Sequence, residues 1–208
     1  MHYYPIFLDV RGRWAVVVGG GRVAERRVRK LLRAGARVYV ISPDLTPGLA
    51  RLAKLKKIHV VRRRYRRGDL YGRGGAGKVP RRWPLLVFAA TDDASAQKAV
   101  FEDAQALGAL VNTADNPSRC DFIVPASFTR GDLQVAISTS GASPALARLL
   151  RRQLQATLGE GYCDHVRRLR ESRRQVLASV PAQKERAKTL REMARKIKDQ
   201  KAKGKNQQ

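Results

Sequence analysis

The segment 14–41 constrains what this chain can fold into more than any other stretch. Five apolar residues (14–18) predict a short buried strand that runs directly into the glycine turn Gly19-Gly20-Gly21-Arg22-Val23-Ala24. A helical stretch follows the turn, Gly35 ends it, and residues 36–41 predict a second strand. A strand, a glycine turn, a helix and a second strand within about thirty residues are typical of the βαβ unit that binds dinucleotides.

Two glycines of this turn have separate predicted roles. Gly19 permits a tight turn at the end of the strand, and Gly21 lets the backbone approach a pyrophosphate without an intervening Cβ. The helix that follows offers unpaired N–H groups and a partial positive charge to the phosphates. The sequence therefore predicts that Gly19 and Gly21 bind a dinucleotide. The alternative is a glycine turn in a helix–sheet fold that binds no nucleotide.

Strands and helices continue to alternate beyond this first unit. The unbroken apolar run at 85–90 and the mainly apolar segments 58–61 and 109–113 predict three more strands, and helices are expected at 45–56 and 91–107. This alternation predicts an α/β fold with a Rossmann-like, doubly wound parallel sheet. A ligand of such a sheet lies beyond the carboxyl ends of the strands, which places Thr91 and Asp92 among the predicted cofactor-binding residues.

The pattern changes after Asp115. Apolar runs at 122–124 and 133–138 predict two strands without a full helix between them, and residues 129–132 predict a hairpin turn. Ser143 and Pro144 then predict the start of a helix, because serine is a favoured N-cap and proline suits the first helical position.

The charge balance narrows the choice of partners. The 208 residues include 43 Lys and Arg against 17 Asp and Glu, a formal net charge of +26. Such a surface suits nucleic acid or a substrate with many carboxylates, and the alternative is that the charges only cover solvated faces. No apolar run approaches bilayer length, so we expect a cytoplasmic protein with no membrane partner. Cys120 and Cys163 form no metal-binding pattern, and we expect reduced thiols and no metal ligands.

Several segments together resemble the precorrin-2 dehydrogenase/sirohydrochlorin ferrochelatase family, the first module of siroheme synthase. The resemblance covers residues 1–158 and depends on the order in which these segments occur. They are Pro5-Ile6-Phe7-Leu8, the glycine turn, Ala90-Thr91-Asp92-Asp93, Asn112-Thr113-Ala114-Asp115, Cys120-Asp121-Phe122-Ile123-Val124-Pro125-Ala126 and Ile137-Ser138-Thr139-Ser140-Gly141-Ala142-Ser143-Pro144-Ala145-Leu146-Ala147-Arg148.

The resemblance implies an NAD-dependent oxidation of precorrin-2 to sirohydrochlorin, a tetrapyrrole that carries several acetate and propionate groups. In many members the same pocket then inserts Fe²⁺. The resemblance also implies a homodimer with a Rossmann domain (1–113), a small α+β dimerisation segment (114–143) and a C-terminal helical domain (144–181). The charged composition of residues 182–208, with few large apolar side chains, predicts a basic, partly disordered tail.

The resemblance assigns roles residue by residue. It implies NAD contacts at Arg22 and Val23 on the glycine turn and at Pro43 and Asp44 after the second strand. It implies a catalytic aspartate at Asp115, whose carboxylate would accept a proton. The substrate site falls on Asn112, Ser138, Thr139 and Ser140.

Three questions stay open in the sequence. No acidic residue ends the second strand at Ile41-Ser42, so the motif leaves NAD and NADP undistinguished unless Asp44 contacts the ribose. The chain is either bifunctional or a dehydrogenase without chelatase activity. The alternative to an enzyme is a nucleotide-sensing, nucleic-acid-binding protein, which only the net charge supports. We expect no specific nucleic-acid partner, because binding through phosphates alone is non-specific.

Overall fold

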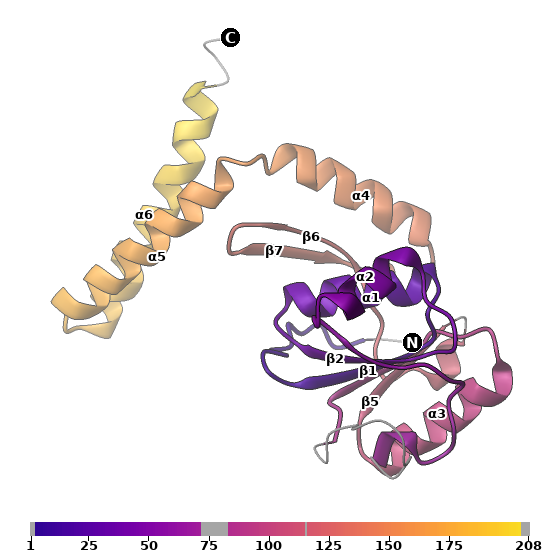
Figure 1. Ribbon diagram of the computed structural model, residues 1–208. Coiled ribbons are helices and arrows are strands. Elements are labelled where there is room, and N and C mark those ends of the chain that lie inside the picture. Colours follow the sequence, from indigo (N-terminus) through magenta and orange to yellow (C-terminus); the bar gives the residue numbers. More distant parts are fainter. Residues whose placement is uncertain (1–2, 72–82, 115, 205–208) are drawn as a thin grey trace. The chain divides into compact units, whose positions relative to one another are not determined.

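The computed structural model describes the backbone of residues 3–71, 83–114 and 116–204, with side chains to residue 195. The chain forms two compact units, Tyr3–Ile123 and Val124–Gln208 (Figure 1). The predicted catalytic residue Asp115 and most of the Gly- and Arg-rich loop after Gly68 lie outside the described residues.

A parallel five-stranded sheet forms the centre of the first unit. Its strands are β1 (Trp14–Val18), β2 (Arg37–Ile41), β3 (His59–Val61), β4 (Leu86–Ala89) and β5 (Leu110–Thr113), in the order β3-β2-β1-β4-β5. Val18 is in register with Ile41 of β2 and with Ala89 of β4, so the central strands end at one common edge. The strands are nearly all apolar because both faces of the sheet are covered.

Three helices cover the two faces of this sheet (Figure 1). The helices α1 (Arg22–Arg33) and α2 (Pro47–Lys54) lie on one face, and α3 (Ala94–Ala106) lies on the other. On the α3 face, Val16 and Val87 belong to one buried cluster with Val100 and Ala104 of the helix. The predicted Rossmann-like fold class is confirmed.

Side-chain caps mark where several helices begin. The Thr46 hydroxyl accepts a hydrogen bond from the Leu49 N–H at the start of α2, and Asp93 accepts from the N–H groups of Ser95 and Ala96 at the start of α3. Each cap satisfies a backbone donor that the helix itself leaves unpaired. Asp93 therefore fixes the start of α3.

The second unit contains a hairpin followed by helices. Strands β6 (Ala126–Arg130) and β7 (Leu133–Ile137) pair antiparallel across a turn at Gly131, as predicted. Helices α4 (Pro144–Thr157), α5 (Tyr162–Ser179) and α6 (Gln183–Gly204) follow, and Ser143 caps α4 as expected. The segment from residue 182 thus contains α6, and its partial disorder stays a prediction.

The strand predicted at 122–124 is wrong. These residues follow an isolated bridge between Asn112 and Cys120. Asp121 pairs with Val111 at the edge of β5: its backbone N–H donates to the Val111 carbonyl oxygen, and its carboxylate accepts from the Val111 N–H. The Asn112 side-chain amide then bonds the Phe122 carbonyl oxygen at 2.9 Å. Side-chain contacts therefore hold this segment in place of a strand ladder, and the next strand begins at Ala126.

Among the described residues, no helix combines the length and apolar character needed to cross a bilayer. Cys120 and Cys163 are both free thiols.

Candidate functional site

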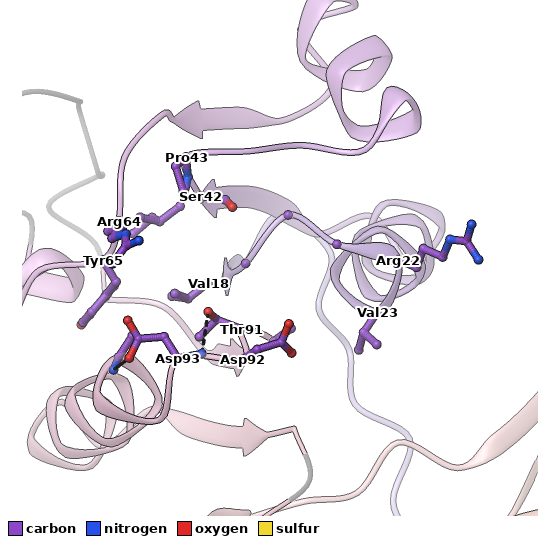
Figure 2. Close-up of a pocket in the computed structure, with 16 residues that line it drawn as sticks. Val18, Arg22, Val23, Ser42, Pro43, Arg64, Tyr65, Thr91, Asp92 and Asp93 are labelled. Carbon is purple, nitrogen blue, oxygen red and sulfur yellow. Dashed lines mark hydrogen bonds between the residues drawn. The ribbon is translucent and has the colours of Figure 1, made fainter.

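A pocket of about 440 Å³ opens at the carboxyl edge of the sheet (Figure 2). It lies where the strand order reverses, between the ends of β1 and β4. Doubly wound sheets bind ligands at such a switch point, because the loops of the two adjacent strands leave toward opposite faces. The lining residues follow four strand ends and are 18–23, 41–43, 64–65, 90–93 and Ala96.

The three consecutive glycines of the turn meet different surroundings. Gly19 has a φ of +118°, and a Cβ on it would lie 2.1 Å from the carbonyl oxygen of Ala90. A Cβ on Gly20 would lie 1.8 Å from the carbonyl oxygen of Asp44, whereas a Cβ on Gly21 would meet nothing within 4 Å. Gly19 and Gly20 are therefore required by the packing of the protein itself, and Gly21 leaves its space open to the pocket.

Helix α1 begins at this pocket without a side-chain cap. Its N-cap is Gly21, which makes no side-chain hydrogen bond, whereas α2, α3 and α4 are each capped by a side chain. The N–H groups of the first turn are thus available to a ligand, and they carry the positive end of the helix dipole. An uncapped helix start beside open space at Gly21 fits a pyrophosphate.

Arg22 and Val23, the first two residues of α1, line the same pocket. Val23 is 40% exposed although it is apolar. Figure 2 shows the Arg22 side chain extending away from Val18 and Thr91, so its backbone is the part nearest the other lining residues.

The end of β2 supplies Ser42 and Pro43 to the pocket, and no carboxylate. Ser42 is 6% exposed, and its hydroxyl donates a 2.8 Å hydrogen bond to the backbone carbonyl oxygen of Asp44. Asp44 itself is exposed and does not line the pocket. The structure therefore brings Pro43 to the predicted cofactor site and leaves the Asp44 side chain outside it.

The end of β4 supplies Thr91, Asp92 and Asp93. The Gln97 side-chain amide donates to the Thr91 carbonyl oxygen at 2.6 Å, which attaches this loop to α3. Hydrogen bonds from the Ser95 hydroxyl and the backbone N–H groups of α3 hold the pKa of the Asp93 carboxyl below its usual range. The Asp93 carboxylate therefore caps α3. The Asp92 carboxylate of the same loop does not cap the helix.

Arg64 and Tyr65 line the pocket from the loop after β3, although neither is among the residues predicted from the sequence. Their position follows the same rule as the other loops, because β3 pairs parallel with β2 and ends at the same edge. The sequence signal for these two residues is the strand predicted at 58–61, because its carboxyl end lies at this edge of the sheet.

The residues predicted to bind substrate are divided between the two units. Asn112 belongs to the first unit, where its amide is engaged by the Phe122 carbonyl oxygen. Ser138, Thr139 and Ser140 belong to the second unit, in the turn before α4. There the Thr139 hydroxyl bonds both the N–H and the carbonyl oxygen of Ser143, and Ser140 has a φ of +51°.

The described residues contain no group of three or more His, Cys, Asp or Glu side chains that could hold a metal ion. Burial raises the pKa of the Cys120 thiol, whose sulfur lies 3.2 Å from the Thr113 carbonyl oxygen. Cys120 is thus a packed thiol in the neutral form.

Comparisons with known proteins agree with this geometry. A family model described as NAD(P)-binding matches residues 6–126, and a model described as sirohaem biosynthesis protein central matches residues 130–157. The chain belongs to this NAD(P)-binding family. Its second match, to the central part of the sirohaem biosynthesis proteins, begins within β6 and ends at the end of α4.

Several relatives of this chain are named siroheme synthases. A siroheme synthase of Nitrosococcus oceani is 43% identical over 162 residues, which are 78% of this chain and 32% of the relative. Siroheme synthase 2 of Aeromonas salmonicida is 38% identical over 183 residues, 86% of this chain and 35% of the relative. The chain thus spans about a third of the length of these curated relatives.

Among solved structures, "SirC, precorrin-2 dehydrogenase" superposes with a TM-score of 0.74 and 29% sequence identity. The match covers 92% of this chain and 89% of that protein. The resemblance to the precorrin-2 dehydrogenase family is confirmed.

Proposed function

We propose that this chain oxidises precorrin-2 to sirohydrochlorin with NAD⁺ as the hydride acceptor. The observation that carries the proposal is the pocket at the switch point, with an uncapped helix start and open space at Gly21, in a chain that superposes over 92% of its length with a precorrin-2 dehydrogenase. NAD is the cofactor that the family resemblance implies.

The residues that would hold the dinucleotide come from three strand ends. The backbone of Gly21, Arg22 and Val23 binds the pyrophosphate, Pro43 contacts the adenosine half, and Thr91 and Asp92 contact the nicotinamide half. The support for this assignment is that all six residues line one pocket. When bound, the dinucleotide supplies the hydride acceptor, and the protein chiefly positions the two rings.

Asp115 is proposed to accept the proton that leaves the substrate when a hydride is transferred. The oxidation removes one hydride and one proton, so it needs a base as well as a hydride acceptor. Asp115 follows Ala114, whose N–H bonds the Ala89 carbonyl oxygen at the end of β4, next to the loop that supplies Thr91. The support is thus the place of this residue in the chain, directly after the strand edge that borders the pocket.

The basic surface suits the proposed substrate. A tetrapyrrole with several acetate and propionate groups is attracted by a net charge of +26, and arginine binds carboxylates through paired hydrogen bonds. The proposed substrate contacts are Asn112, Ser138, Thr139 and Ser140. Iron insertion into sirohydrochlorin stays a prediction.

We also propose a homodimer in which segment 114–143 takes part. The support lies in the helix that directly follows this segment, because Leu146, Leu149 and Leu154 of α4 are 45%, 45% and 40% exposed. Leucines in such numbers on one helix are more often covered by a partner than left in water. Light scattering at several protein concentrations measures this state, and a monomer throughout would contradict it.

The experiment that tests the function is incubation of the purified protein with precorrin-2 under anaerobic conditions, with and without NAD⁺. We expect stoichiometric NADH and sirohydrochlorin, measured by absorbance, only in the complete mixture. Absence of NADH formation by a folded protein that binds NAD⁺ would contradict the proposed substrate but leave the cofactor site intact.

A further inference from the structure

The adenosine end of the pocket has an unusual charge arrangement for an NAD site. NAD-binding Rossmann domains place a carboxylate at the end of the second strand, where it accepts hydrogen bonds from the ribose hydroxyls. Here that position is Ser42, whose hydroxyl is already donated to the Asp44 backbone, and the Asp44 side chain is not in the pocket lining. A phosphate on the ribose would therefore meet no carboxylate from β2.

The loop after β3 contributes a cationic side chain, Arg64, to the same pocket. Arg64 follows β3, which pairs with β2, and it lines the pocket together with Ser42 and Pro43. Figure 2 shows Arg64 on the side of the pocket formed by Ser42 and Pro43. The Arg64 guanidinium takes part in none of the ion pairs or side-chain hydrogen bonds found among the described residues.

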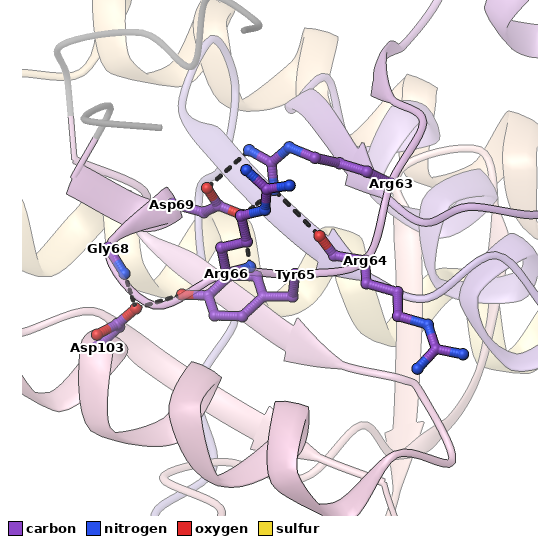
Figure 3. Close-up of polar contacts among 7 residues, drawn as sticks. All are labelled: Arg63, Arg64, Tyr65, Arg66, Gly68, Asp69 and Asp103. Atoms are coloured by element: carbon purple, nitrogen blue, oxygen red, sulfur yellow. Dashed lines mark hydrogen bonds and ion pairs between the residues drawn. The ribbon is translucent and has the colours of Figure 1, made fainter. Parts of the chain in front are cut away.

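Buried contacts on both sides of Arg64 hold its backbone in place (Figure 3). Arg63 turns inward and makes a two-pronged ion pair with Asp69, with N–O distances of 2.7 and 2.8 Å, and Asp69 is 1% exposed. The same Arg63 guanidinium donates to the Arg64 carbonyl oxygen at 3.0 Å. These bonds fix the peptide that carries the Arg64 side chain.

Tyr65 completes this arrangement from the other side. Its hydroxyl donates a 2.5 Å hydrogen bond to Asp103 of α3, and the same carboxylate oxygen accepts the Gly68 N–H at 2.7 Å. Asp103 is 4% exposed. Figure 3 shows the Arg63 and Arg64 side chains leaving the chain in different directions. Among the residues that the structure describes, Arg63 and Tyr65 are bound to buried carboxylates, whereas the Arg64 side chain is not.

We propose that this pocket binds NADP at least as tightly as NAD, and that the Arg64 guanidinium holds the 2′-phosphate of the adenosine ribose. The inference rests on the proposed dinucleotide site and concerns which dinucleotide it takes. Arginine suits this task because its planar guanidinium presents paired donors to a phosphate and stays charged at any physiological pH.

One carboxylate of the pocket, Asp93, interacts electrostatically with this charge, because Arg64 is among the groups that lower the pKa of Asp93. Asp93 caps α3 through three hydrogen bonds from Ser95 and Ala96, and it forms no ion pair with Arg64 within 4 Å in the described part of the chain. Asp92 is on the opposite, β4 side of the pocket. The Arg64 guanidinium is thus left without a direct ion-pair partner in the described part of the chain, on a backbone that Arg63 holds in place.

The test is equilibrium binding of NADP⁺ and NAD⁺ to the purified full chain by calorimetry, without tetrapyrrole. The variants are Arg64→Ala and Arg64→Glu, with Arg62→Ala as the matched control, because Arg62 is an exposed arginine of the same run that does not line the pocket. 2′,5′-ADP and 5′-AMP serve as probes that differ by the 2′-phosphate. Thermal unfolding of each variant checks that it is folded.

We expect wild-type protein to bind NADP⁺ at least as tightly as NAD⁺. Arg64→Ala should weaken NADP⁺ and 2′,5′-ADP by roughly tenfold or more, as for loss of a charge-assisted hydrogen bond, and NAD⁺ by less than about threefold. Arg64→Glu should weaken NADP⁺ further, and Arg62→Ala should change neither cofactor.

Two results would overturn the inference while leaving the proposed function in place. One is tighter binding of NAD⁺ than of NADP⁺ by the wild type. The other is an equal loss of both dinucleotides in Arg64→Ala, which would assign Arg64 to the part that they share. Binding of neither dinucleotide would overturn the cofactor site itself, and with it this inference.

Discussion

Gly19 and Ala90 join the ends of β1 and β4 so closely that no side-chain carbon fits between them. A Cβ on Gly19 would lie 2.1 Å from the Ala90 carbonyl oxygen, which is a backbone atom. The Ala90 N–H also donates to the Val18 carbonyl oxygen at 2.7 Å. This contact brings the two loops of the switch point together and so shapes the pocket.

Gly19→Ala is expected to destabilise the fold by about 3 kcal/mol, from backbone overlap and from a φ of +118° that alanine rarely adopts. Urea unfolding measures this loss. Gly108→Ala is the control, because Gly108 has a φ of +65° but open space around its Cβ, and it should cost about 1 kcal/mol. Equal losses at both positions would contradict the packing argument.

Gly21→Asp is expected to leave the fold intact and to remove dinucleotide binding. The new Cβ meets nothing within 4 Å, but the carboxylate would face the proposed pyrophosphate, and like charges at contact cost several kcal/mol, or on the order of 100-fold in affinity. Calorimetry with NAD⁺ measures the loss. Gly159→Asp adds the same charge at another open glycine and should bind normally. Unchanged affinity in Gly21→Asp would contradict the pyrophosphate assignment.

Asp115→Asn is expected to lower the turnover of precorrin-2 by about 10²–10⁴-fold, the usual contribution of a general base, with unchanged affinity for the dinucleotide. The asparagine keeps the shape of the side chain and removes its ability to accept the proton. Asp164→Asn, an exposed position in the first turn of α5, is the matched control. Turnover within twofold or so of wild type would remove Asp115 from the proposed mechanism.

Tyr65→Phe is expected to cost about 1–2 kcal/mol near neutral pH, since it removes the hydrogen bond to the buried Asp103 carboxylate. Burial, and then the bond to Asp103, raises the pKa of the Tyr65 phenol above its usual 10.0. The unfolded chain therefore releases this proton at lower pH than the folded one, and the stability that Tyr65 contributes falls as pH rises above 10.0.

The difference in unfolding free energy between wild type and Tyr65→Phe should accordingly narrow at alkaline pH. Urea unfolding at a series of pH values measures it. Tyr71→Phe is the control, because Tyr71 is 36% exposed and should show little effect. A gap that stays constant above the usual tyrosine pKa would show that Tyr65 titrates alike in both states.

Local patterns were enough to predict most elements of the first unit. The apolar runs of β1, β2 and β4 are buried on both faces beyond their first residues, so their composition alone marks them as strands of a parallel sheet. The capping side chains of Asp93 and Ser143 accept hydrogen bonds from N–H groups no more than three residues further along the chain. Phe122-Ile123-Val124 failed as a strand because Asp121 and Asn112, which lie apart in sequence, take up the edge of β5.

The glycine turn, the parallel sheet and the sheet edge that carries the pocket could be predicted from the sequence, because each depends on short-range pattern and on the fixed handedness of βαβ units. The set of side chains that share the pocket could not be predicted, because it depends on tertiary contacts. Arg64 enters it and Asp44 does not, since β3 lies beside β2 and the loop after it is held by Asp69 and Asp103, buried carboxylates 5 and 39 residues away from Arg64 in the chain. Contacts between residues so far apart leave no periodic trace in the sequence, and they decide the charge that the cofactor meets.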